Sequence, residues 1–151
     1  MPRRHDTLIP LSHQHHHGLV MCQRVEKAVA RGSREPAALE ALRTEMVAFF
    51  DCDLAPHFAA EAEVLFPAIE HDLGPLALVR ELLGEHGQLL ALAAELRGCA
   101  DPGPPLGEFA ALLRAHIRKE EDLLFPRFES ELDPARAREL AAPLRARLGR
   151  P

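Results

Sequence analysis

Apolar residues recur at intervals of three and four along most of the chain, which is the pattern of an α-helix with one buried face. Proline and glycine residues divide the chain into four long stretches of this kind and one short stretch. The pattern is seen in Leu11, Leu19, Cys22, Val25 and Val29, and again in Leu39, Leu42, Met46, Phe50 and Leu54. We therefore predict four long amphipathic helices and a short C-terminal helix.

The punctuation residues set the expected helix boundaries. The first helix should run from near residue 10 or 12 to about 31, and the second should begin at 36. The third should run from just after 75 to about 97, the fourth from about 108 to about 132, and the short fifth from 134 to about 148. Gly32 closes the first helix, and the segment 98–107, rich in proline and glycine, is a predicted loop. Pro56 lies inside the second helix, where it has no N–H to donate and crowds the carbonyl of Cys52, so a kink is expected there.

Long amphipathic helices joined by short connections favour an all-α fold, an antiparallel up-down four-helix bundle. The composition agrees, because alanine and leucine are abundant and tryptophan and tyrosine are absent. A chain of 151 residues that is 47% hydrophobic and 27% charged fits one domain over residues 1–151. Its core is expected at about 8–132, with the short C-terminal helix at about 134–148.

Charge and hydropathy narrow the classes of partner. The net charge of -5 argues against a nucleic-acid partner, since no face could readily collect enough Lys and Arg to neutralise a row of phosphates. No apolar run approaches the ~20 residues that span a bilayer, and the first ten residues lack the apolar core of a signal peptide. We expect a cytoplasmic protein without a membrane partner.

Cys22, Cys52 and Cys99 form no C-x-x-C pair, so neither a disulfide framework nor a zinc ribbon is indicated.

Two stretches of the chain repeat the same spaced residues. HFAAEAEVLFP begins at His57 and HIRKEEDLLFP begins at His116, and each has Glu at +4, Leu at +8, Phe at +9 and Pro at +10. Residues four apart on a helix lie one turn apart on the same face, separated by roughly 6 Å. The second and fourth helices are therefore each predicted to present an imidazole together with a carboxylate, His57 with Glu61 and His116 with Glu120.

The first and third helices each place one histidine on an apolar stripe. Leucine stands four residues before and four residues after His15, and the same holds for His86. The neighbours of His15 lack this frame: His16 has a serine and a valine at these offsets, and His13 has a histidine four residues after it. His15 is therefore the inward candidate in the run HQHHHGL.

The chain thus contains two copies of a helix pair, and folding them together brings four histidines and two glutamates to one level of the interior. Burying such groups without partners would be very costly, and a metal satisfies them directly. Imidazoles suit iron, zinc or copper, and each carboxylate can bridge two cations. The predicted ligands are His15, His57, Glu61, His86, His116 and Glu120.

A single histidine on an apolar face is more often a hydrogen-bonded core residue than a ligand. Four histidines in repeated frames, two of them with Glu one turn on, fit a metal centre better. Glu63 and Glu121 lie off the core stripe and are expected to be solvated, with two roles left open: hydrogen bonding to a ligand or, for Glu121, bridging. His16 is the most credible spare ligand.

These motifs resemble those of the hemerythrin-like, HHE cation-binding family, over about residues 8–131. The resemblance implies a four-helix bundle with two non-haem iron ions bridged by the two glutamates, with an oxo or hydroxo group completing the bridge. It implies His15 and His57 on one iron, and His86 and His116 on the other. Zinc would accept the same ligands and could substitute for iron.

The chain departs from the oxygen-carrying members of that family. They have two histidines in the third helix, spaced H-x3-H, whereas this chain has leucine on both sides of His86, and they end with H-x4-D, where this chain has Glu at both +4 and +5. Four histidines with one bond each and two bridging carboxylates with two bonds each would supply eight bonds, whereas two octahedral irons together accept about twelve. Open coordination positions are therefore expected, and they need not serve reversible oxygen transport.

The resemblance and the ligand set imply a protein that binds O2, NO or peroxide at a di-iron centre, for sensing, iron handling or stress response. The alternative is a di-iron enzyme, peroxidase-like or ferroxidase-like or active in repair of damaged metal centres; no tyrosine, tryptophan or paired nucleophile marks a substrate site, so enzyme activity stays open. A third possibility is an interaction surface on the basic tail, whose arginines otherwise form a solvated helix face. They are Arg136, Arg138, Arg145, Arg147 and Arg150.

Overall fold

The computed structural model describes residues 3–31 and 36–149, and within them the chain is helical apart from short connections, with no β-strand. The first long helix is α1 (Ile9–Ala30), and the third is α5 (Ala77–Gly98). The second comprises α2 (Pro36–Phe49), α3 (Ala55–Ala60) and α4 (Phe66–Leu73), and the fourth comprises α6 (Gly103–Lys119) and α7 (Phe125–Glu131). The predicted all-α fold is confirmed. Gly32 and Arg150 lie outside the described residues.

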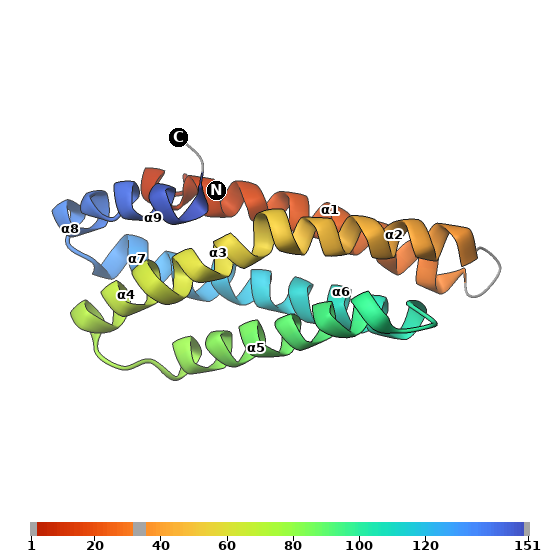
Figure 1. Ribbon diagram of the computed structural model, residues 1–151. Helices are drawn as coiled ribbons and strands as arrows, with labels where there is room; N and C mark the ends of the chain where they lie inside the picture. The colour runs from red at the N-terminus through yellow and green to blue at the C-terminus, as the bar shows by residue number, and fades with distance from the viewer. Residues whose placement is uncertain (1–2, 32–35, 150–151) are drawn as a thin grey trace.

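The four long helices form one bundle. Figure 1 shows them side by side, with the connection from α4 to α5 at one end of the bundle and that from α5 to α6 at the other. The helix α4 ends at Gly74, whose φ of 83° lies in the region that favours glycine. No described helix is both long enough and apolar enough to cross a membrane.

The second and fourth helices contain π turns at their prolines. These turns are η3 (Phe50–Leu54), η4 (Glu61–Leu65) and η5 (Glu120–Leu124), and each is followed by a proline in the first turn of the next α segment. A proline ring has no N–H and crowds the carbonyl four residues earlier, and a wider π turn relieves that crowding. The irregularity expected at Pro56 therefore takes the form of a π turn. Two further π turns, not predicted from the sequence, begin at Glu61 and Glu120.

Two predicted boundaries were wrong. The loop expected at 98–107 is shorter, because α6 begins at Gly103; its prolines occupy the first helical turn, where no intrahelical N–H bond is lost. The tail is two helices rather than one, α8 (Pro134–Glu139) and α9 (Ala141–Leu148). They meet at Leu140, whose N–H approaches the carbonyl of Ala137, and this break places Pro143 in the first turn of α9.

Buried apolar side chains form two clusters along the bundle. One cluster includes Cys22, Met46, Leu89 and Phe109, toward the end of the bundle where α1 meets α2. The other includes Leu8, Phe66, Leu82, Phe125 and Leu144. Polar side chains lie buried at the level between these clusters, which is the level of the repeated histidine and glutamate residues.

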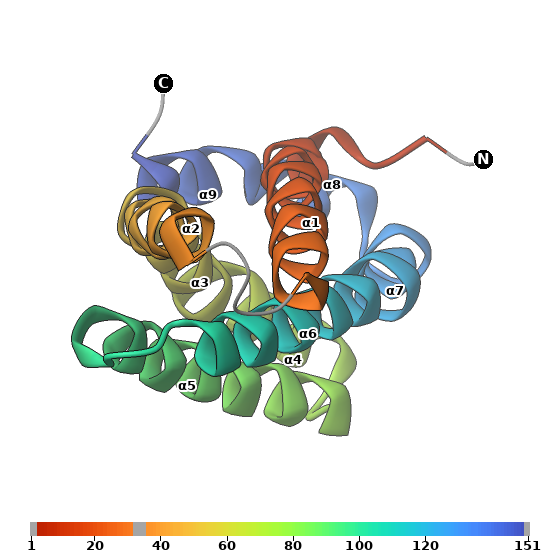
Figure 2. The same cartoon turned by 90° about the vertical axis from the view of Figure 1, so that its right-hand side faces the viewer.

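The chain ends pack together on the second cluster. A short 3-10 turn, η1 (Asp6–Leu8), precedes α1, and its Leu8 is buried with Leu140, Leu144 and Leu148 of the tail. Figures 1 and 2 both show α8 and α9 beside the start of α1. The tail is therefore part of the bundle's packing.

Candidate metal centre

The six predicted ligands come together inside the bundle as two groups of side chains. One group is His15, His57, Glu61 and Glu120, and the other is Glu61, His86 and His116; within each group one ligand atom per residue lies within 4.8 Å of the others. Each of the four long helices contributes at least one of these residues. Glu61 belongs to both groups, so its carboxylate is shared between two sets of side chains that could each hold a metal ion.

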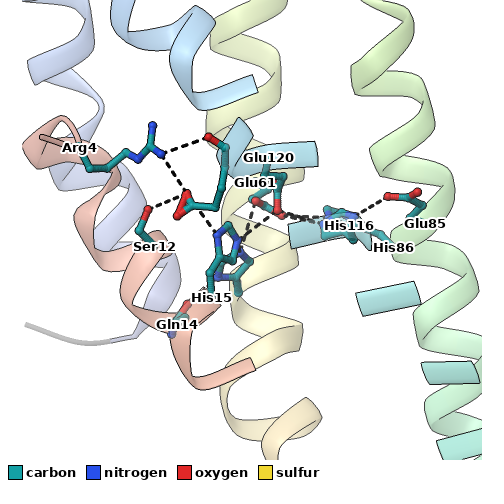
Figure 3. A network of polar contacts seen from close by, with 11 residues as sticks. Arg4, Ser12, Gln14, His15, Glu61, Glu85, His86, His116 and Glu120 are labelled. Carbon is teal, nitrogen blue, oxygen red and sulfur yellow. Dashed lines mark hydrogen bonds and ion pairs between the residues drawn. The ribbon is translucent and has the colours of Figure 1, made fainter. Parts of the chain in front are cut away.

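The two carboxylates lie between the imidazoles (Figure 3). Glu120 Oε1 is 3.2 Å from His15 Nε2 and 3.1 Å from His116 Nε2. Glu61 Oε1 is 3.0 Å from His86 Nε2, whereas Glu61 Oε2 is 3.3 Å from His57 Nε2. All four histidines therefore direct Nε2 toward the same pair of carboxylates.

Local helix geometry explains this convergence. His57 lies in α3 and Glu61 begins η4, while His116 lies in α6 and Glu120 begins η5. The four-residue spacing is thus completed within regular α-helix, and the wider turn starts only at the glutamate. The π turn then displaces the residues that follow, and π turns of this kind are frequent at functional sites.

The buried polar atoms fit a bound cation. Glu61 and Glu120 are fully buried, and among the described residues Glu61 Oε2, His116 Nε2 and both Glu120 oxygens have no hydrogen-bond partner. A buried polar atom without a partner costs about 1–3 kcal/mol, and more when it is charged. Metal coordination would satisfy these atoms together, because they already face a common space.

Two polar side chains orient histidines from behind. His57 Nδ1 lies 2.7 Å from Gln14 Oε1, and His116 Nδ1 lies 2.8 Å from Glu85 Oε1. The oxygens accept, so each Nδ1 donates, and the Nε2 lone pair of each ring is left for a cation. Lys119 forms ion pairs with Glu85 and, at 2.6 Å, with Glu81.

His15 faces a second polar network. Glu121 Oε2 lies 3.7 Å from His15 Nδ1 and accepts a hydrogen bond of 2.9 Å from Ser12 Oγ. Arg4 lies 3.6 Å from the same carboxylate and donates to the Glu121 carbonyl at 3.1 Å (Figure 3). Glu121 is therefore a partner of His15 on the side away from Glu120.

Phenylalanine rings stack on His15 and His86, the two histidines whose own helices place no predicted glutamate ligand beside them. His86 stacks on Phe58 with ring centroids 4.2 Å apart, and on Phe66 with centroids 5.7 Å apart. His15 stacks on Phe125 with centroids 5.6 Å apart. Phe66 and Phe125 occupy the same place in the two copies of the repeat, so each copy uses its phenylalanine to support the histidine of another helix.

Neighbouring carboxylates shift the pKa values of two of the converging histidines. Burial alone would lower the pKa of His15, but Glu120 and Glu121 outweigh it and raise the pKa to about 9. Burial is likewise outweighed at His116, where Glu120 and Glu61 raise the pKa to about 11. Burial opposes the charged form of Glu61, but His57 and the other neighbours hold the pKa of that carboxyl well below its ordinary range. These directions favour the protonated forms of His15 and His116 beside an ionised Glu61 when no cation is bound.

The other candidate residues lie elsewhere. His16 is exposed, and Glu63 is exposed and pairs with Arg147 at 2.9 Å. Leu90, read as part of the apolar stripe of the third helix, is 59% exposed, whereas Leu89 is buried. Two helical turns take about seven residues, so Leu89 returns to the face of Leu82, whereas Leu90 lies beyond that face. The buried stripe therefore passes through Leu89.

Sequence reasoning missed Gln14 and Glu85. Each directly precedes the histidine of its own helix and hydrogen-bonds the histidine of the following long helix. A polar residue at this same place in both copies of the repeat is the signal that could have identified them. Their partners lie on another helix, so spacing along one helix does not indicate the contact.

Comparison with known proteins bears on the same residues. No match to the chain was found among curated proteins, and none among solved structures. A family model described as the hemerythrin HHE cation binding domain matches residues 7–128, and this range includes all six converging side chains. Because the match covers well over half of the chain, the protein belongs to the hemerythrin HHE cation-binding domain family.

Proposed function

We propose that this protein is an antiparallel up-down four-helix bundle that holds two non-haem iron ions and binds O2, NO or peroxide at them. Such binding would serve sensing, iron handling or stress response. The observation that carries the proposal is the pair of ligand groups that share Glu61, in a chain of a cation-binding family. One shared carboxylate between two groups suits two cations better than one.

The donor set favours iron over a hard cation. Four imidazole nitrogens and two carboxylates suit iron, zinc or copper, whereas magnesium and calcium prefer oxygen alone. When bound, a non-haem iron pair with open coordination positions supplies the capacity to bind small diatomic or peroxidic ligands. Zinc is the competing occupant, although its structural sites close at four ligands.

The chain's own residues define what can reach the centre. Apolar clusters on either side, with Phe125 stacked on His15 and Phe66 on His86, keep bulk water away. Gln14 and Glu85 keep two rings in the orientation that a cation needs. His86 is the most accessible of the four histidines, with 11% of its side chain exposed, so ligand entry is expected on its side.

The test compares metal content between variants. Glu61→Ala and Glu120→Ala remove carboxylates that lie between two imidazoles, so both should abolish binding of a metal pair. His16→Ala and Glu63→Ala change exposed residues and should leave most of it. Metal per chain is measured after purification with iron supplied, with circular dichroism as the check that each variant is folded.

Equal losses in all four variants would refute the assignment of the glutamates. Retention of two metals per folded chain in Glu61→Ala would do the same. Loss confined to the two buried glutamates supports it.

A further inference from the structure

A hollow of about 530 Å³ lies where the N-terminal segment meets the tail, apart from the metal centre. Its lining is unusually basic for a chain with a net charge of -5. The charged and polar lining residues are Arg3, Arg4, His5, Asp6, Thr7, Arg138 and Arg145. Four arginines and one carboxylate therefore line the same hollow.

The walls of the hollow are fixed by packing. Thr7 Oγ1 donates a buried hydrogen bond of 2.8 Å to the carbonyl of Ala137, which ties η1 to α8. Leu8 and Leu144 are buried in the same apolar cluster, which ties η1 to α9. The views in Figures 1 and 2 agree that these two ends of the chain lie together. The arginines thus extend from a backbone that is already held in place.

The tail arginines divide into two classes. Arg136 lies 3.8 Å from Asp72, and Arg147 lies 2.9 Å from Glu63, so both pair with carboxylates of the second long helix. Arg138 and Arg145 line the hollow, and within residues 3–31 and 36–149 neither side chain has a hydrogen bond or an ion pair. The tail therefore directs two uncompensated guanidinium groups at the hollow.

The N-terminal arginines also line the hollow, but they pair with carboxylates. Arg4 is anchored by Glu129 at 2.7 Å and by Glu121, while Arg3 meets only the exposed Asp6, at 3.4 Å. Asp6 is the one carboxylate of the lining. The excess positive charge of the hollow therefore comes from Arg138 and Arg145, whose side chains pair with no described acidic residue.

We propose that this hollow binds a phosphate group of a small molecule. Guanidinium groups bind phosphate through paired N–H···O bonds, and a phosphate offers several acceptor oxygens and up to two charges, enough for more than one arginine. A carboxylate has one charge and two oxygens, which a single arginine satisfies. The basic residues surround one concavity rather than a long stripe, which suits a small phosphate compound better than a nucleic-acid backbone.

The experiment is calorimetric titration of the iron-loaded protein with pyrophosphate and, separately, with inorganic phosphate. The test variant is Arg138→Ala/Arg145→Ala, and the matched control is Arg136→Ala/Arg147→Ala. The control removes the same charge from the same tail but leaves the hollow intact. Because phosphates also bind metal ions, the comparison between these variants separates the hollow from the metal centre.

The wild-type protein should bind pyrophosphate saturably, one per chain, and more weakly as salt is added. Each lost guanidinium contact is expected to weaken binding about tenfold, so the test variant should bind roughly 100-fold more weakly. The control should stay within about threefold of wild type. No saturable binding of either anion by wild type would overturn the proposal, as would equal affinities in wild type and the test variant. An equal loss in the control would also overturn it.

Discussion

Glu85 offers a sharp test of how the chain holds its proposed metal ligands, because among these six residues its carboxylate hydrogen-bonds His116. Its carboxylate is buried and accepts the His116 Nδ1 hydrogen at 2.8 Å, on the side of the ring opposite Glu61 and Glu120. Glu85→Ala removes the acceptor and leaves the ring free to rotate. Glu85→Gln keeps an acceptor oxygen but removes the charge.

The expected loss follows from the role of such partners. Removing a carboxylate that orients a metal-bound histidine typically weakens metal affinity by about 10–100-fold, or roughly 1.4–2.7 kcal/mol. We expect Glu85→Ala in this range and Glu85→Gln near its lower end. The metal affinity of the group formed by Glu61, His86 and His116 should fall. The group with His15 and His57 keeps its Gln14 contact and should hold its metal more tightly than the first group does in this variant.

Competition with a chelator of known affinity measures the two binding steps separately. Glu81→Ala is the matched control, since Glu81 contacts Lys119 as Glu85 does but is 54% exposed and does not reach His116. The reasoning fails if Glu85→Ala binds both metals as wild type does, or if Glu81→Ala loses as much affinity as Glu85→Ala. A loss spread equally over both steps would contradict the assignment of His116 to one of the two groups.

Three further predictions concern pH and packing. Metal loading near pH 7 should release protons, because His15 and His116 with pKa values of about 9 and 11 must lose protons to bind; an indicator dye in weak buffer measures the release. Metal affinity should for the same reason rise with pH through about 9 and on toward 11. Both pKa values lie above the ordinary 6.5, so their contribution to the stability of the metal-free protein is complete below pH 6.5 and is lost as pH rises through about 9 and then 11; urea unfolding at pH 6 and pH 9.5 should show the fall, and a rise would contradict it. Gly84→Ala should raise the free energy of unfolding by about 0.5–1 kcal/mol, since an added Cβ at this exposed helical position meets nothing within 4 Å; a decrease on denaturant unfolding would show that the added methyl meets an obstacle.

The two histidine–glutamate pairs of the site could be predicted because both members of each pair lie on the same helix. His57 with Glu61, and His116 with Glu120, depend only on the one-turn spacing of a helix, and the π turns begin at the glutamates and leave that spacing intact. The choice of His15 over its neighbours follows from the apolar stripe, and His15 is buried while His16 is exposed. These features depend on residues near one another in the chain, so they can be predicted from a single sequence.

Contacts between helices could not be predicted in the same way. Gln14 and Glu85 act on histidines of other helices, and whether a polar side chain reaches across depends on how the helices pack. The stripe argument also failed at Leu90, because a four-residue step repeated twice drifts away from the buried face. The tail was expected as one helix, but the turn at Leu140, just before Pro143, divides it.

The most direct measurement is the metal content and visible spectrum of protein purified with iron supplied, recorded before and after reduction and exposure to O2 or NO. The two ligand groups that share Glu61 lead us to expect about two irons per chain, with a charge-transfer band that changes on reduction and on exposure to the gas. A colourless protein that holds a single zinc ion and cannot accept iron would contradict the account.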